Sequence, residues 1–161
     1  MKTVVLYYSF EGNTEYIATL LKDKLNADLV RVKPVKDLKN KGFSKYIWGG
    51  KQVYMNEKPK LIPFNVDINS YDRVFLGSPV WAWTLAPAIK TVCEDYLRNQ
   101  SIHCFYTHEG GDKGIDEKAQ VMINQHNHLE SIQGFMNVLK TKDQMKSQVD
   151  DWLNTISKKE S

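Results

Sequence analysis

Short strand-forming runs alternate with helix-forming segments along this chain of 161 residues. Strands are expected at residues 4–8, 27–34, 73–77, 101–106 and 131–138, and helices at 13–25, 87–97, 115–125 and 142–157. Parallel strands require long crossover connections, which are usually helices, so this alternation predicts right-handed βαβ units. We therefore expect one α/β domain over residues 1–161, built as a three-layer, doubly wound, five-stranded parallel sheet.

The first strand and the first helix have the clearest patterns. Residues 4–8, "VVLYY", form a short apolar run rich in β-formers, which is typical of a buried strand. Apolar residues then recur at helical spacing over residues 13–25, which predicts a helix with one face in the core. The strand at 27–34 contains polar residues and ends in proline, so we expect it near a sheet edge. A further short helix is expected at 44–53, although Gly49 and Gly50 weaken that expectation.

Composition points to an ordinary globular protein. The chain has 42% hydrophobic and 25% charged residues, and no apolar run approaches the length of a membrane span. The N-terminal residues do not resemble a signal peptide, so a cytoplasmic location is expected. The two cysteines, Cys93 and Cys104, lack metal-ligand spacing and are expected to be free thiols. The histidines of "HNH" at 126–128 have only Glu130 nearby, so we expect no metal site.

The positive charge is concentrated in one segment. The net charge is +3, and residues 33–60 contain eight lysines against only Asp37 and Glu57. Contact with nucleic acid, docking of an acidic protein, and a solvated face over the aromatic residues of 43–54 are the alternatives. The segment contains no arginine to form bidentate phosphate contacts. We therefore favour the solvated face, and expect neither a nucleic-acid nor a membrane partner.

Three loops with unusual sequences follow predicted strands, at residues 9–14, 78–87 and 107–114. In an open parallel sheet, ligands bind at the carboxyl ends of the strands, where the strand order reverses. The three loops should meet at that point if the first and third strands are neighbours.

The first loop, "SFEGNT", has the composition of an anion site. Backbone N–H groups of Gly12, Asn13 and Thr14 would open a helix N-terminus, and the hydroxyls of Ser9 and Thr14 would add donors. The loop lacks the lysine of a P-loop and the GxGxxG pattern, which disfavours triphosphate and dinucleotide binding. Helix capping by Ser9 or Asn13 is the alternative explanation.

The other two loops suit a flat ligand. Trp81 and Trp83 follow a buried strand and could stack on a planar group, or instead pack onto a helix. The third loop, "THEGGDKG", contains three glycines that would let backbone N–H groups face a ligand edge, although a surface turn has similar composition. Together, the three loops predict a ligand with a phosphate end and a flat end.

The motifs "SFEGNT", "YDRVFLGSPVWAW" and "FYTHEGG" resemble those of short-chain flavodoxins and flavodoxin-like FMN proteins, and the resemblance covers essentially the whole chain. It implies the flavodoxin-like strand order 2-1-3-4-5 with FMN between the first and third strands, which is an established property of that fold. By resemblance, the cofactor-binding residues would be Ser9, Glu11, Gly12, Asn13 and Thr14 around the phosphate, Pro79, Val80, Trp81, Ala82 and Trp83 on one side of the ring, and Thr107, His108, Glu109, Gly110 and Gly111 on the other. Many flavodoxins have Thr or Ser at the position of Glu11, so here only its backbone N–H is expected to face the phosphate.

The resemblance implies an electron carrier that exchanges electrons with a reductase and an acceptor protein, with no catalytic acid or base. Carboxylates of Glu11, Glu109 and Asp112 near the ring would disfavour added negative charge and so lower its reduction potential. Classical flavodoxins are markedly acidic and this chain is not, so an FMN-dependent NAD(P)H:quinone or nitro-compound oxidoreductase using His108 is the alternative.

Two further classes of protein with this fold are alternatives. A receiver domain is excluded because its acidic pair at the end of the first strand is replaced by Tyr8 and Ser9. A binding module that has lost its flavin is a further alternative, and Glu11 is its main support.

Overall fold

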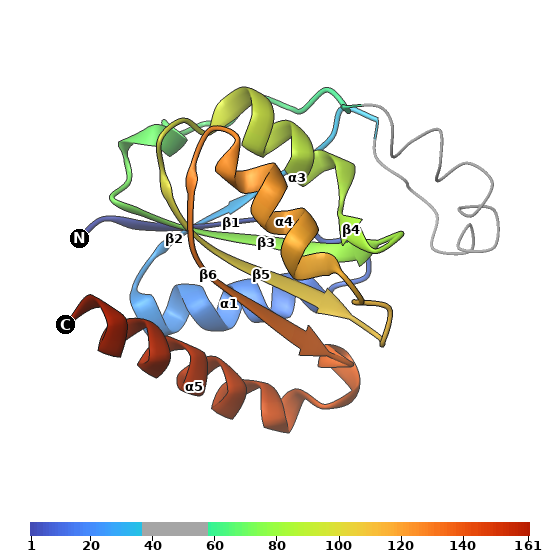
Figure 1. Ribbon diagram of the computed structural model, residues 1–161, viewed down its shortest axis with the longest axis vertical. Helices are drawn as coiled ribbons and strands as arrows, with labels where there is room; N and C mark the ends of the chain where they lie inside the picture. Colours follow the sequence, from blue (N-terminus) through green and yellow to red (C-terminus); the bar gives the residue numbers. More distant parts are fainter. Residues whose placement is uncertain (37–57) are drawn as a thin grey trace.

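The computed structural model describes residues 1–36 and 58–161, so the helix expected at 44–53 lies outside the described residues. Five parallel strands pair in the order β2-β1-β3-β5-β6 (Figure 1). Their bounds are β1 Thr3–Tyr7, β2 Asp28–Arg31, β3 Arg73–Trp81, β5 Ser101–His108 and β6 His128–Met136. The predicted α/β fold and strand order are confirmed, with β2 at an edge. A short strand, β4 Thr84–Leu85, pairs antiparallel with β3 and was not predicted.

Helices cover both faces of the sheet and complete the three layers (Figure 1). One face carries α1 Asn13–Leu25 and α5 Lys142–Glu160. The other carries α3 Pro87–Thr91, its π-helical continuation η3 Val92–Tyr96, and α4 Ile115–Asn124. Pro87 begins α3, where its missing N–H costs no helical hydrogen bond. Two short 3-10 turns, η2 Ile68–Ser70 and η4 Val138–Lys140, complete the described structure.

Aromatic rings from neighbouring strands fill the layer between the sheet and α5. Phe75, Phe105 and Phe135 surround Trp152, with ring centroids 5.5, 6.4 and 6.1 Å from the indole. The Phe105 ring lies against Gly77 on β3, where an added Cβ would be only 2.1 Å from the ring. Gly77 is therefore needed for this packing, since interiors have no spare volume at such contacts.

Strand β3 is longer than the sequence predicts. The Gly-Ser-Pro sequence suggested an end at Gly77, but pairing with β5 continues to Pro79 and the strand runs on to Trp81. Ala82 and Trp83 then form a two-residue hairpin turn with φ of 49° and 62° before β4. Hairpin turns with positive φ usually contain Gly or Asn, so the sequence carried no turn signal here.

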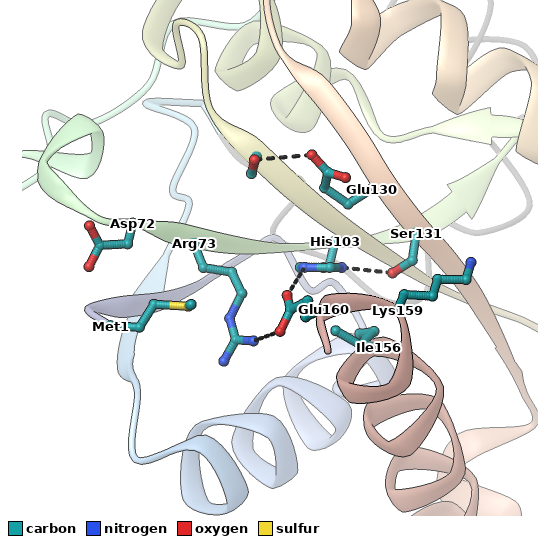
Figure 2. A pocket seen from close by; sticks show the side chains of 10 residues that line it. Met1, Asp72, Arg73, His103, Glu130, Ser131, Ile156, Lys159 and Glu160 are labelled. Atoms are coloured by element: carbon teal, nitrogen blue, oxygen red, sulfur yellow. Dashed lines mark hydrogen bonds and ion pairs between the residues drawn. The ribbon is translucent and has the colours of Figure 1, made fainter.

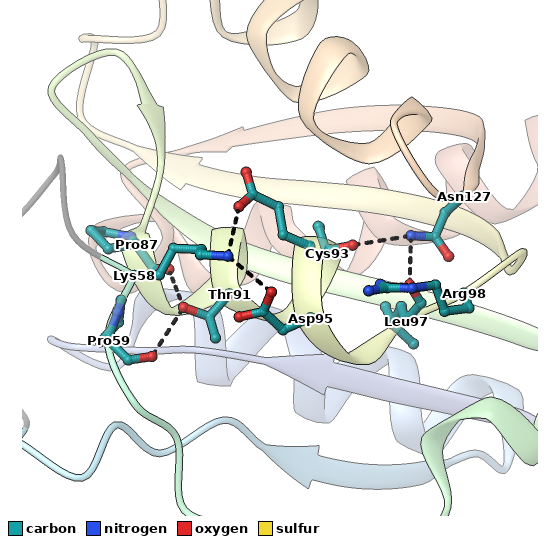
Figure 3. Close-up of polar contacts among 10 residues, drawn as sticks. Lys58, Pro59, Pro87, Thr91, Cys93, Asp95, Leu97, Arg98 and Asn127 are labelled. Carbon is teal, nitrogen blue, oxygen red and sulfur yellow. Dashed lines mark hydrogen bonds and ion pairs between the residues drawn. The ribbon is translucent and has the colours of Figure 1, made fainter.

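The helix η3 departs from α geometry because Leu97 N–H donates to the carbonyl of Val92, five residues earlier. The buried side chain of Asn127 donates to the carbonyls of Cys93 and Leu97, at 3.4 and 3.2 Å (Figure 3). Asn127 therefore supplies hydrogen bonds to carbonyls at the end of this helix, which would otherwise be poorly satisfied.

The chain returns to the described domain at Lys58 and is anchored there on the same helix. Lys58 Nζ pairs with the carboxylates of Glu94 and Asp95 at 3.4 and 2.9 Å (Figure 3). The Thr91 hydroxyl donates to the Pro59 carbonyl at 3.0 Å. At least one lysine of the basic segment 33–60 is thus paired with acidic residues of its own chain.

Candidate functional site

The carboxyl ends of β1, β3, β5 and β6 lie side by side, and we call this end of the sheet the carboxyl edge. Tyr7 is in register with Gly77, Pro79 with Thr107, and His108 with Met136. The structure therefore brings the three predicted loops to one edge, as expected. It adds a fourth segment, the turn at η4, which follows β6 and was not part of the predicted site.

The first loop combines a capped helix with unpaired donors. Gly12 has φ of 99° and immediately precedes α1, while the buried hydroxyl of Ser9 accepts hydrogen bonds from the N–H groups of Gly12 and Glu15, both at 3.2 Å. Within residues 1–36 and 58–161, the N–H groups of Asn13 and Thr14 have no acceptor. Capping by Ser9 is thus present, and two donors at the positive end of α1 remain open to an anion.

Side chains of the first loop connect it to distant segments. The Oγ1 atoms of Thr14 and Thr107 are 2.8 Å apart, and both residues are buried. Asn13 does not cap the helix; its Oδ1 accepts from the N–H of Leu139 in η4 at 3.2 Å. The loop is therefore held in place by β5 and by η4, which sequence reasoning did not reveal.

Arg31 supplies a positive charge that the loop itself lacks. From the end of β2, its guanidinium donates to the Ser9 carbonyl at 2.9 Å and pairs with Glu15 at 3.2 Å. Glu11 is exposed, in keeping with the expectation that its side chain avoids the loop interior. Sequence reasoning missed Arg31; the parallel pairing of β1 and β2, which aligns Tyr7 with Arg31, is the signal that could have found it.

The two tryptophans of the second loop have different environments. Trp81 is only 7% exposed and makes edge-to-face contacts with Tyr8 and Phe10, at 5.6 and 5.8 Å between ring centroids. Trp83 lies in the hairpin turn and is 48% exposed. The Ser78 hydroxyl accepts from the Ala86 N–H at 2.8 Å and so fixes the base of this loop. Trp81 therefore packs in the core, while Trp83 is accessible at the carboxyl edge.

The third loop is organised around His108. Its Nδ1 accepts from the Gly110 N–H at 3.0 Å, and its Nε2 lies 3.6 Å from Asp112. Gly110 has φ of 114°, and a side chain at Gly110 or Gly111 would meet no atom within 4 Å among the described residues. Glu109 lies 3.5 Å from Lys140 of η4. The backbone of Gly110 and Gly111 is therefore exposed, next to the His108 and Asp112 side chains, which lie beside each other.

A pocket of roughly 310 Å³ lies at the opposite end of the sheet, which we call the amino edge (Figure 2). Glu160 of α5 lies 3.4 Å from Arg73 and 3.7 Å from the buried His103, whose Nδ1 is 2.8 Å from the Ser131 hydroxyl. Burial, and then the Arg73 guanidinium, lower the pKa of His103 below its ordinary value of 6.5. Apart from Arg73 Nε, which has no acceptor among the described residues, these groups pair with one another.

Cys93 and Cys104 are free thiols, as predicted. Both are buried, and burial raises the pKa of the Cys93 thiol to about 12. Residues 1–36 and 58–161 contain no cluster of three or more His, Cys, Asp or Glu suited to a metal ion. Over the same ranges, no helix has both the length and the apolar character needed to cross a bilayer.

Comparison with known proteins gives consistent results. The family model described as Flavodoxin matches residues 2–156. The flavodoxin-like domain-containing protein BilS of Clostridioides difficile strain CD3 is 30% identical over 134 residues, which are 80% of this chain and only 62% of BilS. The chain therefore spans less than two thirds of that relative's length.

Solved structures share the fold at lower identity. A Lactobacillus acidophilus flavoprotein crystallised in complex with FMN has a TM-score of 0.70 at 23% identity, covering 94% of this chain and 97% of its own. A putative flavoprotein from Bacteroides eggerthii has a TM-score of 0.75 at 22% identity, covering 97% and 98%. Oxidised flavodoxin 2 of Bacillus cereus has a TM-score of 0.57 at 17% identity, covering 99% of both chains.

Proposed function

This chain belongs to the flavodoxin family, and we propose that it binds FMN at the carboxyl edge and carries electrons between redox proteins. The observation that carries the proposal is that the N–H groups of Asn13 and Thr14, at the start of α1 behind Gly12, have no acceptor among the described residues. The similarly folded Lactobacillus acidophilus flavoprotein, which was crystallised with FMN, supports the choice of ligand.

The first loop fits the phosphate end of FMN. Two N–H donors at this helix N-terminus have no acceptor among the described residues and suit a dianion, and Gly12 contributes no side chain that would obstruct its approach. The nearest acidic side chain on α1, Glu15, is paired with Arg31, while Glu11 is exposed. Ser9 contributes mainly by shaping the loop, since its oxygen accepts two backbone N–H groups.

The other two loops fit the flat end. Trp83 offers an exposed indole at the hairpin turn, and Pro79 and Val80 are half-buried beside it. Opposite them, the N–H of Gly111 has no acceptor among the described residues, whereas that of Gly110 is bonded to His108 Nδ1. Trp81 would support the second loop from the core side, because it is packed against Tyr8 and Phe10.

Bound FMN would supply the capacity to accept and release electrons, and the chain would tune and shield that chemistry. Glu109 and Asp112 belong to the third loop, and their carboxylates would disfavour negative charge on a reduced ligand. His108 is held by the Gly110 N–H and faces Asp112, so it is poorly placed to donate a proton to a second substrate. This engagement favours the carrier over the NAD(P)H-dependent oxidoreductase. The expected partners are a reductase and an electron acceptor.

The test is a titration of the purified full chain with FMN, followed by absorbance and flavin fluorescence. We expect quenched fluorescence and saturable binding at micromolar or lower FMN. The loaded protein should then accept electrons from a flavodoxin-type reductase and pass them to a one-electron acceptor protein. No binding at micromolar FMN would refute the proposal. Direct reduction by NAD(P)H with turnover of a quinone or nitro compound would replace the carrier with the oxidoreductase.

A further inference from the structure

We propose that Thr107, on β5, is a positioning residue for the phosphate of FMN, and that it acts through Thr14. The inference rests on the proposed function and changes the role expected for Thr107, which the sequence resemblance places beside the flavin ring. It is carried by one contact, the 2.8 Å separation of the two Oγ1 atoms.

The contact joins two parts of the site that are far apart in sequence. Thr14 lies in the first turn of α1, and Thr107 lies near the carboxyl end of β5, in register with Pro79 and Phe135. Thr14 is 1% exposed and Thr107 is 3% exposed, so water has little access to either hydroxyl. The pair therefore lies between the carboxyl ends of the strands and the loop that would receive a phosphate.

The Thr14 and Thr107 hydroxyls have one more hydrogen than their shared hydrogen bond uses. Each hydroxyl has one hydrogen to donate, and the single hydrogen bond between them uses only one of the two. Neither hydroxyl has a second partner among the described residues. One buried O–H is therefore left without an acceptor, which is a costly arrangement in a low-dielectric environment.

Either hydroxyl can be the donor in this contact, and the position of Thr14 beside the phosphate loop favours Thr107 as the donor to it. If Thr107 donates to Thr14, the remaining hydrogen belongs to Thr14 and is adjacent to the N–H groups of Asn13 and Thr14. A phosphate oxygen bound by those N–H groups is then within the same loop as the free O–H. Thr107 would hold the Thr14 hydroxyl as a donor to the phosphate without touching the ligand itself, and would not contribute to contacts with the ring.

The test compares FMN with riboflavin, which has the same ring system but no phosphate, in fluorescence titrations at fixed ionic strength. Thr107→Val keeps the β-branched shape and removes the hydroxyl. We expect it to raise the Kd for FMN about tenfold while changing the Kd for riboflavin less than twofold. Thr107→Ser should restore FMN binding. In a double-mutant cycle, T107V should add little to the loss already caused by T14V, because Thr107 acts through Thr14.

The control is Thr91→Val, which removes another buried hydroxyl, one that donates to Pro59 away from the carboxyl edge. T91V should leave the ratio of FMN to riboflavin affinity unchanged. If T107V does not fold, Thr107→Ala is tested for the same ratio. Equal losses for FMN and riboflavin, or full additivity with T14V, would overturn the inference while leaving the proposed function intact. Absence of FMN binding by the wild-type chain would instead remove both.

Discussion

The two edges of the central sheet contain similar polar groups and differ in whether those groups have partners. At the amino edge, Arg73 and His103 meet Glu160, and the Tyr71 hydroxyl donates to Asp28 at 2.7 Å. At the carboxyl edge, the N–H groups of Asn13 and Thr14 have no acceptor within the described parts of the chain. Both edges are formed by the same strands, so the difference lies in the side chains and loops that stand at each end of them.

This difference makes the carboxyl edge a better ligand site than the pocket at the amino edge. The amino edge has a cavity, yet most of its side chains satisfy one another and a ligand would have to displace an ion pair. The carboxyl edge instead has donors on fixed backbone, which need no rearrangement to receive an anion. The arrangement of unpaired groups is therefore better evidence for a ligand than the presence of a cavity.

The largest expected effect is on the core packing beneath the carboxyl edge. Gly77→Ala places a methyl group into the Phe105 ring, so it should reduce the free energy of unfolding by about 3 kcal/mol. Urea denaturation of the flavin-free chain measures this loss. Gly111→Ala is the control, since no atom lies within 4 Å of its added Cβ among the described residues, and it should change stability by less than about 0.5 kcal/mol. Equal stabilities for the two variants would contradict the packing argument.

The next prediction concerns Gly12, which lies at the carboxyl edge. Gly12→Ala puts an L-residue at φ 99°, which should cost about 1 kcal/mol of stability and weaken FMN binding about tenfold. Asn26→Ala is the control, because Asn26 also has positive φ, at 49°, and lies at the opposite end of α1 from the first loop. It should lose similar stability without changing FMN affinity. Thermal unfolding and FMN titration measure the two quantities, and unchanged binding in G12A would remove Gly12 from the phosphate site.

A smaller effect is expected from pH at the amino edge. The pKa of His103 is lowered in the folded chain, so the unfolded chain takes up this proton at a higher pH. Stability from this group is complete above about pH 6.5 and is lost as pH falls through the folded pKa. Groups facing His103 are Arg73, Glu160, Glu130 and Lys159.

The measurement compares unfolding free energies of wild type and His103→Gln between pH 7 and 5. The variant should show a shallower decline, and its FMN affinity should match wild type because the amino edge is remote from the proposed site. His126→Gln, which removes an exposed histidine, is the control and should keep the wild-type decline. An unchanged decline in H103Q would show that other groups set the pH dependence.

The smallest expected effect concerns the hairpin turn. Ala82 has φ of 49°, which is unfavourable for an L-residue, so Ala82→Gly should raise stability by about 0.5 kcal/mol after the entropic cost of glycine. Chemical denaturation can resolve this gain. Ala88→Gly, in the helix α3, should instead lower stability by at least about 1 kcal/mol. A loss in A82G similar to that in A88G would argue against strain in the turn.

Most of the fold could be predicted because its elements have strong local patterns. The apolar run at 4–8, the helical spacing at 13–25 and the Pro87 start of α3 all agree with the structure, since core burial and propensity favour the same choice. Boundaries were less accurate: β6 begins at His128, three residues before the predicted start. The extension of β3 past Gly77 was missed because long-range pairing with β5 outweighed the local signal of Pro79, and the β3–β4 hairpin was missed because Ala82 and Trp83 carry no turn signal.

The site could be predicted at the level of loops but not of partners. The three loops reach one edge because parallel strands place their carboxyl ends together, which a sequence pattern encodes. Contacts such as Thr14 with Thr107, or Arg31 with the Ser9 carbonyl, depend on strand register, which no local pattern specifies. Trp81 and Trp83 had similar sequence contexts, and only the hairpin geometry separates the buried ring from the exposed one.

The π-helical turn at η3 indicates where relatives of this chain can differ in length by one residue. A turn closed by Leu97 N–H to the Val92 carbonyl contains one residue more than an α-helical turn. The segment is thus equivalent to an α-helix carrying a single-residue insertion, with Asn127 compensating the displaced carbonyls. Relatives that lack one residue between 92 and 96 can therefore keep the same helix axis and the same sheet, and an amide at the position of Asn127 would then serve only the N–H of Gln100, which donates to its Oδ1 at 3.1 Å.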